Sequence, residues 1–320
     1  MSSEQEKKKL RKCNYMLIGR RGAGKTVALI LMAGTAEFFA KRELRIPEEK
    51  GIKLLTRRGA EEFDLHSAMT RLIYYGIGPQ PNRPEWGDLR YELRMSIANP
   101  LIPILTRDIS IYIADPSGEI TSEFSKIIST GCGNIGERLI ERLKAKGISD
   151  EGVYEVVNTI LHDLDGFIFV ARLKDLKTDY DFYISPEEAQ AVRTPDDEFA
   201  NFIANYILYH ECEGVKKKLK AIVLITHIDK SPEYMKYKDL SKYANILVER
   251  YLMHTKNYLS DKRMFEKWIP VVSGIFGGEY REGEYTRFTL AAETKGRRHI
   301  DYPIDQYVKL LRFIIGTCGD

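Results

Sequence analysis

The chain has 320 residues, 43% of them hydrophobic and 30% charged, so it can bury a full core and lacks the composition of a disordered chain. Its formal net charge of +3 is too small to indicate binding to nucleic acid or to a membrane surface. The polar first twelve residues do not predict a signal peptide, and no apolar run reaches the roughly 18 residues of a membrane span.

The four cysteines are Cys13, Cys132, Cys212 and Cys318. They are far apart, and no pair has the C-x-x-C spacing of a zinc or redox site. Their pattern predicts no disulfide framework. We therefore expect reduced cysteines in a cytoplasmic protein with no transmembrane segment and no direct nucleic-acid partner.

Strands and helices alternate along the chain. The predicted strands are residues 15–19, 90–96, 109–115, 166–171, 221–226 and 268–273. Helical periodicity is found in residues 27–40, 60–75, 137–146, 153–161, 197–210, 240–258 and 304–315. Asp196 and Asp197, which follow Pro195, are expected to cap the helix at 197–210. This alternation predicts an α/β sheet with helices on both faces.

The domain organisation is predicted to be simple. Residues 1–13 form a polar, basic tail, and residues 14–320 form one elaborated domain, because no low-complexity linker or internal repeat divides them. Two long segments between predicted strands, at about 41–87 and 120–165, contain helical patterns. We interpret them as helical inserts in that domain.

The first strand leads into the sequence G-x-x-x-x-G-K-T, which ends at Thr26 and is followed at once by a helical segment. This is a phosphate-binding loop in the setting that it requires. Gly22 and Gly24 let the backbone N–H groups turn toward phosphate oxygens. Lys25 is expected to reach the β- and γ-phosphates, and the Thr26 hydroxyl to bind Mg²⁺. The predicted phosphate contacts are Gly19, Arg20, Arg21, Gly22, Ala23, Gly24, Lys25, Thr26 and Val27.

A second motif, D-x-x-G, ends the apolar strand at 109–115. Asp115 is expected to hold Mg²⁺ through a coordinated water. The Gly118 N–H is expected to bond the γ-phosphate, so that loss of this phosphate frees the following segment.

Two further motifs follow buried strands. Thr226-His227-Ile-Asp229 ends the strand at 221–226, and Asp229 could accept hydrogen bonds from guanine N1–H and N2–H₂, a donor pair that adenine lacks. Ser273 and Gly274, after the last predicted strand, could offer backbone N–H groups to guanine O6.

These four motifs, in this order at four strand ends, resemble the GTPases of the TRAFAC class of P-loop proteins. The sequence D-P-S-G-E at 115–119 is most similar to the prokaryotic double-GTPase-like branch. The resemblance covers residues 15 to about 275. It implies a P-loop NTPase three-layer sandwich, with a mostly parallel six-stranded sheet in which 90–96 is the one antiparallel strand. The nucleotide is then expected across the carboxyl ends of the other strands.

The chain departs from this family at three places. His227 replaces the usual lysine of the base-reading motif, and Glu119 stands where many members have a water-orienting glutamine. The threonine that closes over Mg²⁺ has no clear counterpart, since Thr56 and Thr70 are the only threonines between the first helix and the second predicted strand. Thr56 is the better candidate.

Together these observations predict a GTP- and Mg²⁺-binding switch that hydrolyses GTP slowly to GDP and phosphate. Lys25, Gly118 and Glu119 are the predicted catalytic residues, and residues 119–130 with part of the first insert could present the bound state to a protein effector. Two alternatives stay open. An ATPase is one, although Pro116 occupies the place where many ATPases have a glutamate. A non-hydrolysing, nucleotide-bound scaffold is the other.

Overall fold

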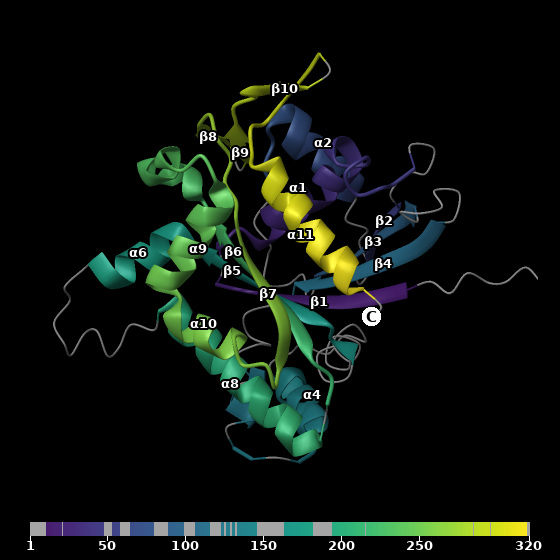
Figure 1. Cartoon of the computed structure of the whole chain (residues 1–320), viewed down its shortest axis with the longest axis vertical. Coiled ribbons are helices and arrows are strands. Elements are labelled where there is room, and N and C mark those ends of the chain that lie inside the picture. The colour runs from purple at the N-terminus through teal and green to yellow at the C-terminus, as the bar shows by residue number, and fades with distance from the viewer. Residues whose placement is uncertain are drawn as a thin grey trace, which may run out of the picture.

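The computed structural model describes residues 11–20, 22–47, 53–57, 65–79, 89–98, 106–115, 123–145 without 125, 129 and 132, 163–181, and 194–318 without 215, 284 and 295. In chain order (Figure 1) the elements are β1 Arg11–Ile18, α1 Lys25–Gly34, the π-helix η1 Thr35–Phe39, β2 Lys53–Arg57, α2 Leu65–Tyr75, β3 Leu89–Ala98, β4 Thr106–Asp115, α4 Ile135–Ala145, β5 Gly166–Arg172, α6 Leu173–Asp181, α8 Pro195–Glu213, β6 Leu219–Thr226, the 3₁₀ helices η4 Ile228–Lys230 and η5 Pro232–Lys236, α9 Leu240–Tyr251, α10 Met253–Leu259, β7 Phe265–Val272, β8 Glu279–Glu282, β9 Tyr285–Phe288, β10 Ala292–Thr294, β11 Arg297–His299 and α11 Ile304–Thr317.

The main sheet has seven described strands in the order β2-β3-β4-β1-β5-β6-β7. Parallel pairs join β4 to β1, β1 to β5, β5 to β6, and β6 to β7. Strand β3 is antiparallel to both β2 and β4, so it alone among these strands runs against the others. The predicted α/β class and the antiparallel strand at 90–96 are confirmed.

The prediction of six strands is wrong by one, because β2 adds a seventh at the edge of the sheet. This strand lies inside the segment 41–87, which we expected to be helical. It has only five residues, Lys-Leu-Leu-Thr-Arg, and such a short run carries little strand periodicity. Its pairing with β3, a contact that no local pattern encodes, makes it a strand.

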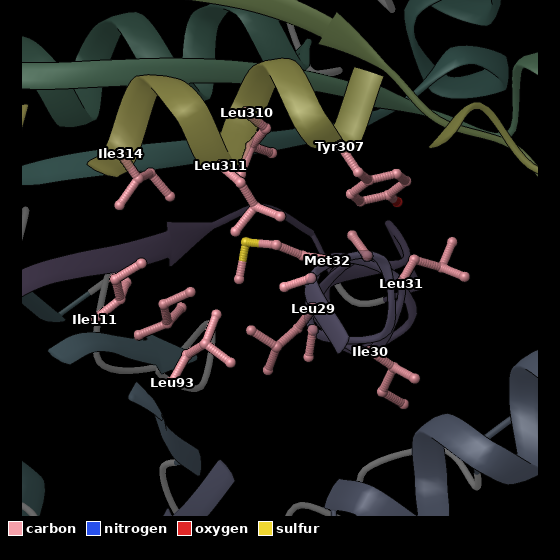
Figure 2. Packing of buried hydrophobic residues seen from close by; sticks show 14 of the residues in the cluster. Leu29, Ile30, Leu31, Met32, Leu93, Ile111, Tyr307, Leu310, Leu311 and Ile314 are labelled. Atoms are coloured by element: carbon pink, nitrogen blue, oxygen red, sulfur yellow. The ribbon is translucent and has the colours of Figure 1, made fainter. Parts of the chain in front are cut away.

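One face of the sheet is covered by α1, η1, α2 and α11. Figure 2 shows Met32 of α1 beside Leu311 of α11, in the same cluster as Leu29, Ile314 and Leu93 of β3, and all five side chains are buried. Burial of about five such side chains contributes on the order of 10 kcal/mol before entropy is counted. This packing fixes α1, and so the loop before it, against the centre of the sheet.

The opposite face is covered by α4, α6, α8, α9 and α10, whose buried side chains form a second cluster. Aromatic rings dominate it. Phe167 of β5 packs edge-on against Phe202 and Tyr206 of α8, with ring centroids 5.5 and 4.9 Å apart. Helices therefore lie on both faces, as predicted.

Helix α8 differs from the prediction at its start. Its N-cap is Thr194, whose Oγ1 accepts from Asp197 N while the Asp197 carboxylate accepts from Thr194 N, a complete capping box. Asp196 does not cap α8. Its buried carboxylate accepts the N–H groups of His254 and Thr255 at 2.9 and 2.7 Å, at the start of α10. The predicted helix at 240–258 is accordingly two helices, α9 and α10.

Other boundaries shift by a few residues. Strand β1 begins at Arg11, inside the predicted tail, and the predicted helix at 27–40 is α1 followed by η1. The helix predicted at 153–161 lies outside the described residues. Within 120–165, helix α4 agrees with the prediction of a helical insert.

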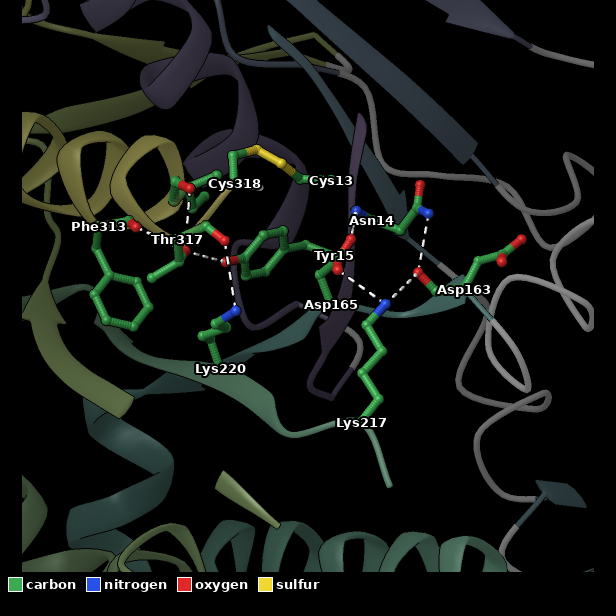
Figure 3. The surroundings of a disulfide bond; sticks show 11 residues. Cys13, Asn14, Tyr15, Asp163, Asp165, Lys217, Lys220, Phe313, Thr317 and Cys318 are labelled. Carbon is green, nitrogen blue, oxygen red and sulfur yellow. Dashed lines mark hydrogen bonds and ion pairs between the residues drawn. A yellow bond between two sulfur atoms is a disulfide. The ribbon is translucent and has the colours of Figure 1, made fainter. Parts of the chain in front are cut away.

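The expectation of reduced cysteines is wrong for Cys13 and Cys318, which form a disulfide between β1 and the end of α11 (Figure 3). Their Cα atoms are 5.6 Å apart although 305 positions separate them in sequence. Cys212 is also disulfide-bonded. Such pairings depend on which chain ends the fold brings together, and spacing alone does not reveal them.

Candidate functional site

The candidate site lies at the carboxyl end of β1, in the centre of the sheet. After β1 and α1, the chain forms β2, β3 and β4 on one side of β1. It then forms β5, β6 and β7 on the other side. In open α/β sheets a reversal of strand order of this kind leaves a crevice at the carboxyl ends of the strands. The loop at 19–24 is placed there by the sheet topology.

Two glycines of this loop have left-handed backbones, with φ of 79° at Gly22 and 86° at Gly24. Other residues adopt such angles only with strain. Between them the Ala23 N–H donates to Arg20 O at 3.1 Å, which closes a turn. Gly24 is the N-cap of α1, and no side chain caps the helix there. The first N–H groups of α1 are therefore arranged as in an anion site at a helix N-terminus.

Gly19 is required for a different reason, because a Cβ at this position would lie 2.3 Å from the Val170 carbonyl oxygen of β5. The loop thus begins in direct backbone contact with the neighbouring strand. This contact allows β1 and β5 to approach each other at the point where the loop starts.

The Lys25 side chain folds back over the loop. Its Nζ donates to Gly19 O at 2.9 Å and lies 3.4 Å from Arg20 O. The ammonium is thereby held against the first two carbonyl groups of the loop. Thr26 follows in the first turn of α1 and is half-buried, while Val27 packs against the core.

Arg20 points away from the loop and pairs with Glu198 of α8, with Nε and Oε2 3.0 Å apart. About a third of each side chain is exposed, so the pair contributes less than about 1 kcal/mol. Its effect is mainly to orient Arg20 toward α8. Arg21 lies outside the described residues.

The T-H-x-D motif contacts the loop directly. Thr226 Oγ1 donates to Ala23 O at 2.7 Å in a buried environment. His227 Nδ1 lies 3.0 Å from the same hydroxyl oxygen, and a Cβ at Gly24 would lie 3.2 Å from His227 Cε1. Burial lowers the pKa of His227 below its ordinary value. The structure therefore joins the first and third motifs through a neutral imidazole and a buried hydroxyl.

The third and fourth motifs also meet. Asp229 Oδ1 accepts from the Ile275 N–H at 3.3 Å, and Lys230 Nζ lies 3.5 Å from Oδ2. Both contacts are long, so the carboxylate keeps acceptor capacity for a ligand. A Cβ at Gly274 would lie 2.6 Å from Asp229 Oδ1, and glycine at this position therefore gives the carboxylate its space.

Ser273 itself faces the core. Its N–H donates to Ile225 O at 2.8 Å within the sheet, and its hydroxyl lies 2.6 Å from the Tyr307 hydroxyl. Its predicted backbone contact with a base is thus replaced by a contact in the sheet. Gly274 is the residue of this pair that borders Asp229.

The second motif is described only at its start. In the parallel pairing of β1 with β4, Met16 is opposite Ala114, so the backbone of Asp115 lies level with the end of β1. Gly118 and Glu119 lie outside the described residues. Thr56 lies in β2, three strands from β1, or about 14 Å at the usual strand spacing. The sheet therefore places it far from the loop.

No three His, Cys, Asp or Glu side chains of the described segments gather into a metal-holding group. The Mg²⁺ site expected from the sequence is of another kind. Thr26 and Asp115 would each provide oxygen, the ligand type that Mg²⁺ prefers, and phosphate oxygens and water would complete the shell. Thr26 lies in the first turn of α1, and Asp115 is the last residue of β4.

Sequence reasoning missed several contacts of the site. Two of these contacts involve elements distant in sequence. Glu198 orients Arg20, and the Val170 carbonyl group leaves no room for a Cβ at Gly19. Lys230 Nζ also pairs with Glu279 of β8 at 3.1 Å. No local pattern around these residues indicates the contacts.

Comparison with models of known protein families gives no match, and comparison with curated proteins finds no similar chain. In the part of the chain that the structure describes, no helix is long and apolar enough to cross a membrane.

Proposed function

We propose that this chain is a P-loop NTPase of the GTPase type, which binds GTP–Mg²⁺ and hydrolyses it slowly to GDP and phosphate. The observation that carries the proposal is the convergence of three motifs. The loop at 19–24, the Thr226–Asp229 segment and Gly274 come from three strands and meet at one end of the sheet. A nucleotide needs this combination of a phosphate cradle and a base-reading carboxylate in one place.

Each described residue has a role in the proposal. The loop N–H groups and Lys25 hold the β- and γ-phosphates, and Thr26 with Asp115 holds Mg²⁺. When bound, Mg²⁺ offsets the charge of the phosphate oxygens. Asp229 accepts the N1–H and N2–H₂ donors of guanine. Adenine offers no such pair, so this carboxylate favours guanine over adenine.

Hydrolysis proceeds by in-line attack of water on the γ-phosphorus, with a bond formed to the water oxygen and the bond to the β–γ bridging oxygen broken. Lys25 and the loop N–H groups stabilise the charge that develops on the transferred group. Glu119 positions the water, and its negative charge near the γ-phosphate accounts for a slow rate. Loss of the γ-phosphate releases Gly118 and the residues after it, and a protein effector reads this change.

The proposal is tested by measuring nucleotide affinity and phosphate release for the wild type, Lys25→Ala and Asp115→Ala in the presence of Mg²⁺. We expect Lys25→Ala to weaken binding of the triphosphate and both variants to lower phosphate release at least tenfold. Glu119→Ala should retain binding and lose most of the turnover. If Lys25→Ala and Asp115→Ala leave binding and turnover intact, the proposal is wrong. Tight binding without phosphate release above the enzyme-free control would favour the scaffold alternative.

A further inference from the structure

His227 replaces the lysine of the base-reading motif in the family that the chain resembles. Its backbone conformation is also uncommon. It has φ of 58° and ψ of 34°, a left-handed conformation that few non-glycine residues adopt. The chain turns sharply here, directly after β6, and the imidazole is brought against Gly24. His227 as a whole is half-buried.

The hydrogen bonds of Thr226 fix the tautomer of this ring. The single hydroxyl proton of Thr226 is donated to a carbonyl oxygen, that of Ala23 at 2.7 Å. The contact of 3.0 Å between Thr226 Oγ1 and His227 Nδ1 therefore needs its proton from the ring. Nδ1 carries the hydrogen, and Nε2 of the neutral imidazole is left with a lone pair.

Nε2 makes no hydrogen bond to any described residue, although Nδ1 of the same ring is fully used. The charged side chains that face the ring are Asp229, Glu279, Arg172 and Lys230, two of each sign. Their charges balance, so they do not by themselves hold a proton on Nε2. The ring nitrogen of His227 that has no described partner is therefore a hydrogen-bond acceptor.

The position of this acceptor identifies its ligand group. A nucleoside phosphate is built in the order phosphate, sugar, base. In the proposed site the phosphates lie at Gly24 and the base lies at Asp229. A Cβ at Gly24 would lie 3.2 Å from His227 Cε1, so the ring lies close to Gly24, and His227 precedes Asp229 by two residues. Of the three parts of the ligand, the sugar is the one that passes this ring.

We propose that His227 Nε2 accepts a hydrogen bond from a ribose hydroxyl, which makes the site selective for ribonucleotides over deoxyribonucleotides. A hydroxyl donor matches an acceptor nitrogen, whereas a deoxy carbon leaves that nitrogen desolvated and unpaired. This inference rests on the proposed function, because it takes the phosphate loop and Asp229 as the two ends of the nucleotide site.

The test is direct calorimetric titration of the wild type with unlabelled GDP, 2′-deoxy-GDP and 3′-deoxy-GDP in Mg²⁺ at neutral pH. Unlabelled diphosphates avoid both hydrolysis and fluorophores attached to the ribose. We expect at least one deoxy analogue to bind about three- to tenfold more weakly than GDP, the effect of one neutral hydrogen bond.

Two variants test whether the His227 imidazole causes the difference in affinity between GDP and the deoxy analogue. His227→Asn tolerates a left-handed backbone and is too short to reach the sugar, while His227→Phe keeps a ring against Gly24 and lacks the nitrogen. In each, GDP should bind as weakly as the discriminated analogue, with that analogue nearly unchanged. Thermal melting of each variant shows that it is folded, and the wild-type comparison needs no variant.

The outcomes are distinct. Equal affinities for all three ligands in the wild type, or discrimination that survives in both variants, overturn the role of His227 and leave the proposed function standing. If a variant binds GDP and both analogues more weakly by the same factor, the ring acts on the phosphates. This result would also overturn the proposed contact with the ribose. If the wild type binds no guanine nucleotide, the proposed function fails and this inference fails with it.

Discussion

At the scale of single residues, the glycines of the site differ in what a side chain would disturb. At Gly22 there is open space and the constraint is the left-handed backbone, whereas at Gly274 the constraint is the space itself. A Cβ there would lie 2.6 Å from Asp229 Oδ1 and 3.0 Å from Asp229 N. Contacts this short force either the carboxylate or the backbone to move, and the proposed role of Asp229 in reading the base depends on both.

We predict that Gly274→Ala reduces affinity for guanine nucleotides at least tenfold, because the displaced carboxylate can no longer accept both guanine donors. The measurement is nucleotide titration, with Gly316→Ala as control. A Cβ at Gly316 in α11 meets nothing within 4 Å, so alanine there should leave binding unchanged and stabilise the helix slightly. Wild-type affinity in Gly274→Ala would show that Asp229 does not read the base.

Because of His210, near the end of α8, we predict that the free energy of unfolding depends on pH. His210 is buried beside Tyr206, with ring centroids 4.8 Å apart, and burial followed by the charge of Lys217 lowers its pKa to about 4. The unfolded chain has a histidine pKa of about 6.5. As pH falls from about 6.5 to 4, only the unfolded state gains this proton, and the folded state loses stability by about 2–3 kcal/mol.

His210→Phe removes this titration, so the free energy of unfolding should fall less steeply over that pH range than in the wild type. Urea unfolding at several pH values measures the slope. An unchanged profile in His210→Phe would contradict the assignment.

At the scale of elements, one buried hydroxyl joins β6 to the loop that precedes α1. Thr226 Oγ1 donates to Ala23 O, and no local interaction of the loop replaces that donor in the part of the chain described. Thr317 is comparable in type and burial but lies at the other end of the sheet, where its hydroxyl meets the Tyr15 hydroxyl at 3.0 Å.

Thr226→Val and Thr317→Val should therefore both lower the free energy of unfolding, by about 1–2 kcal/mol each, since each leaves buried polar groups without a partner. Only Thr226→Val should also weaken nucleotide binding, because only it loosens the loop. Chemical denaturation and nucleotide titration of both variants separate the two effects. Equal nucleotide affinity in the two variants would mean that the β6–loop contact is purely structural.

The elements that the sequence predicted well have strong local patterns. The apolar strands that became β1 and β4 to β7, and the helix after the glycine-rich loop, are encoded by runs of adjacent residues. The antiparallel strand followed from the resemblance. Within the site, three positions were predictable because they belong to recognisable local patterns. Lys25 begins the helix after the glycine-rich loop, Thr226 ends an apolar strand, and Asp229 follows that strand by three residues.

The remaining features depend on contacts between distant residues. Asp196 looked like the cap of its own helix, yet its carboxylate caps α10, 58 and 59 positions away. Residues 53–57 form strand β2 because they pair with the edge of β3. The choice of Glu198 as the partner of Arg20 likewise depends on where α8 lies over the sheet. No single-sequence pattern encodes these choices.

At the scale of the whole molecule, the two ends of the described chain are tied together. The Cys13–Cys318 disulfide joins β1 to α11, and beside it Lys220 Nζ lies 3.4 Å from Thr317 O (Figure 3). A cross-link across 305 positions restricts the unfolded chain strongly and contributes about 2–5 kcal/mol. It also anchors β1, the strand that leads into the loop at 19–24.

We predict that Cys318→Ser lowers the melting temperature by several degrees under non-reducing conditions. A variant is preferable to a reducing agent, since Cys212 is disulfide-bonded as well and would respond to it. A melting temperature equal to that of the wild type would mean that the cross-link does not form in solution.

The proposed function depends most directly on the identity of the bound nucleotide. The decisive measurement is displacement of fluorescent GDP by GTP, GDP, ATP and ADP in Mg²⁺, with Asp229→Asn titrated against guanine and xanthine nucleotides alongside. We predict strong guanine preference in the wild type and a shift toward xanthine in the variant, because an amide can donate to the xanthine oxygen that replaces the guanine amine. Equal or better displacement by ATP would contradict the assignment of Asp229 and favour the ATPase alternative.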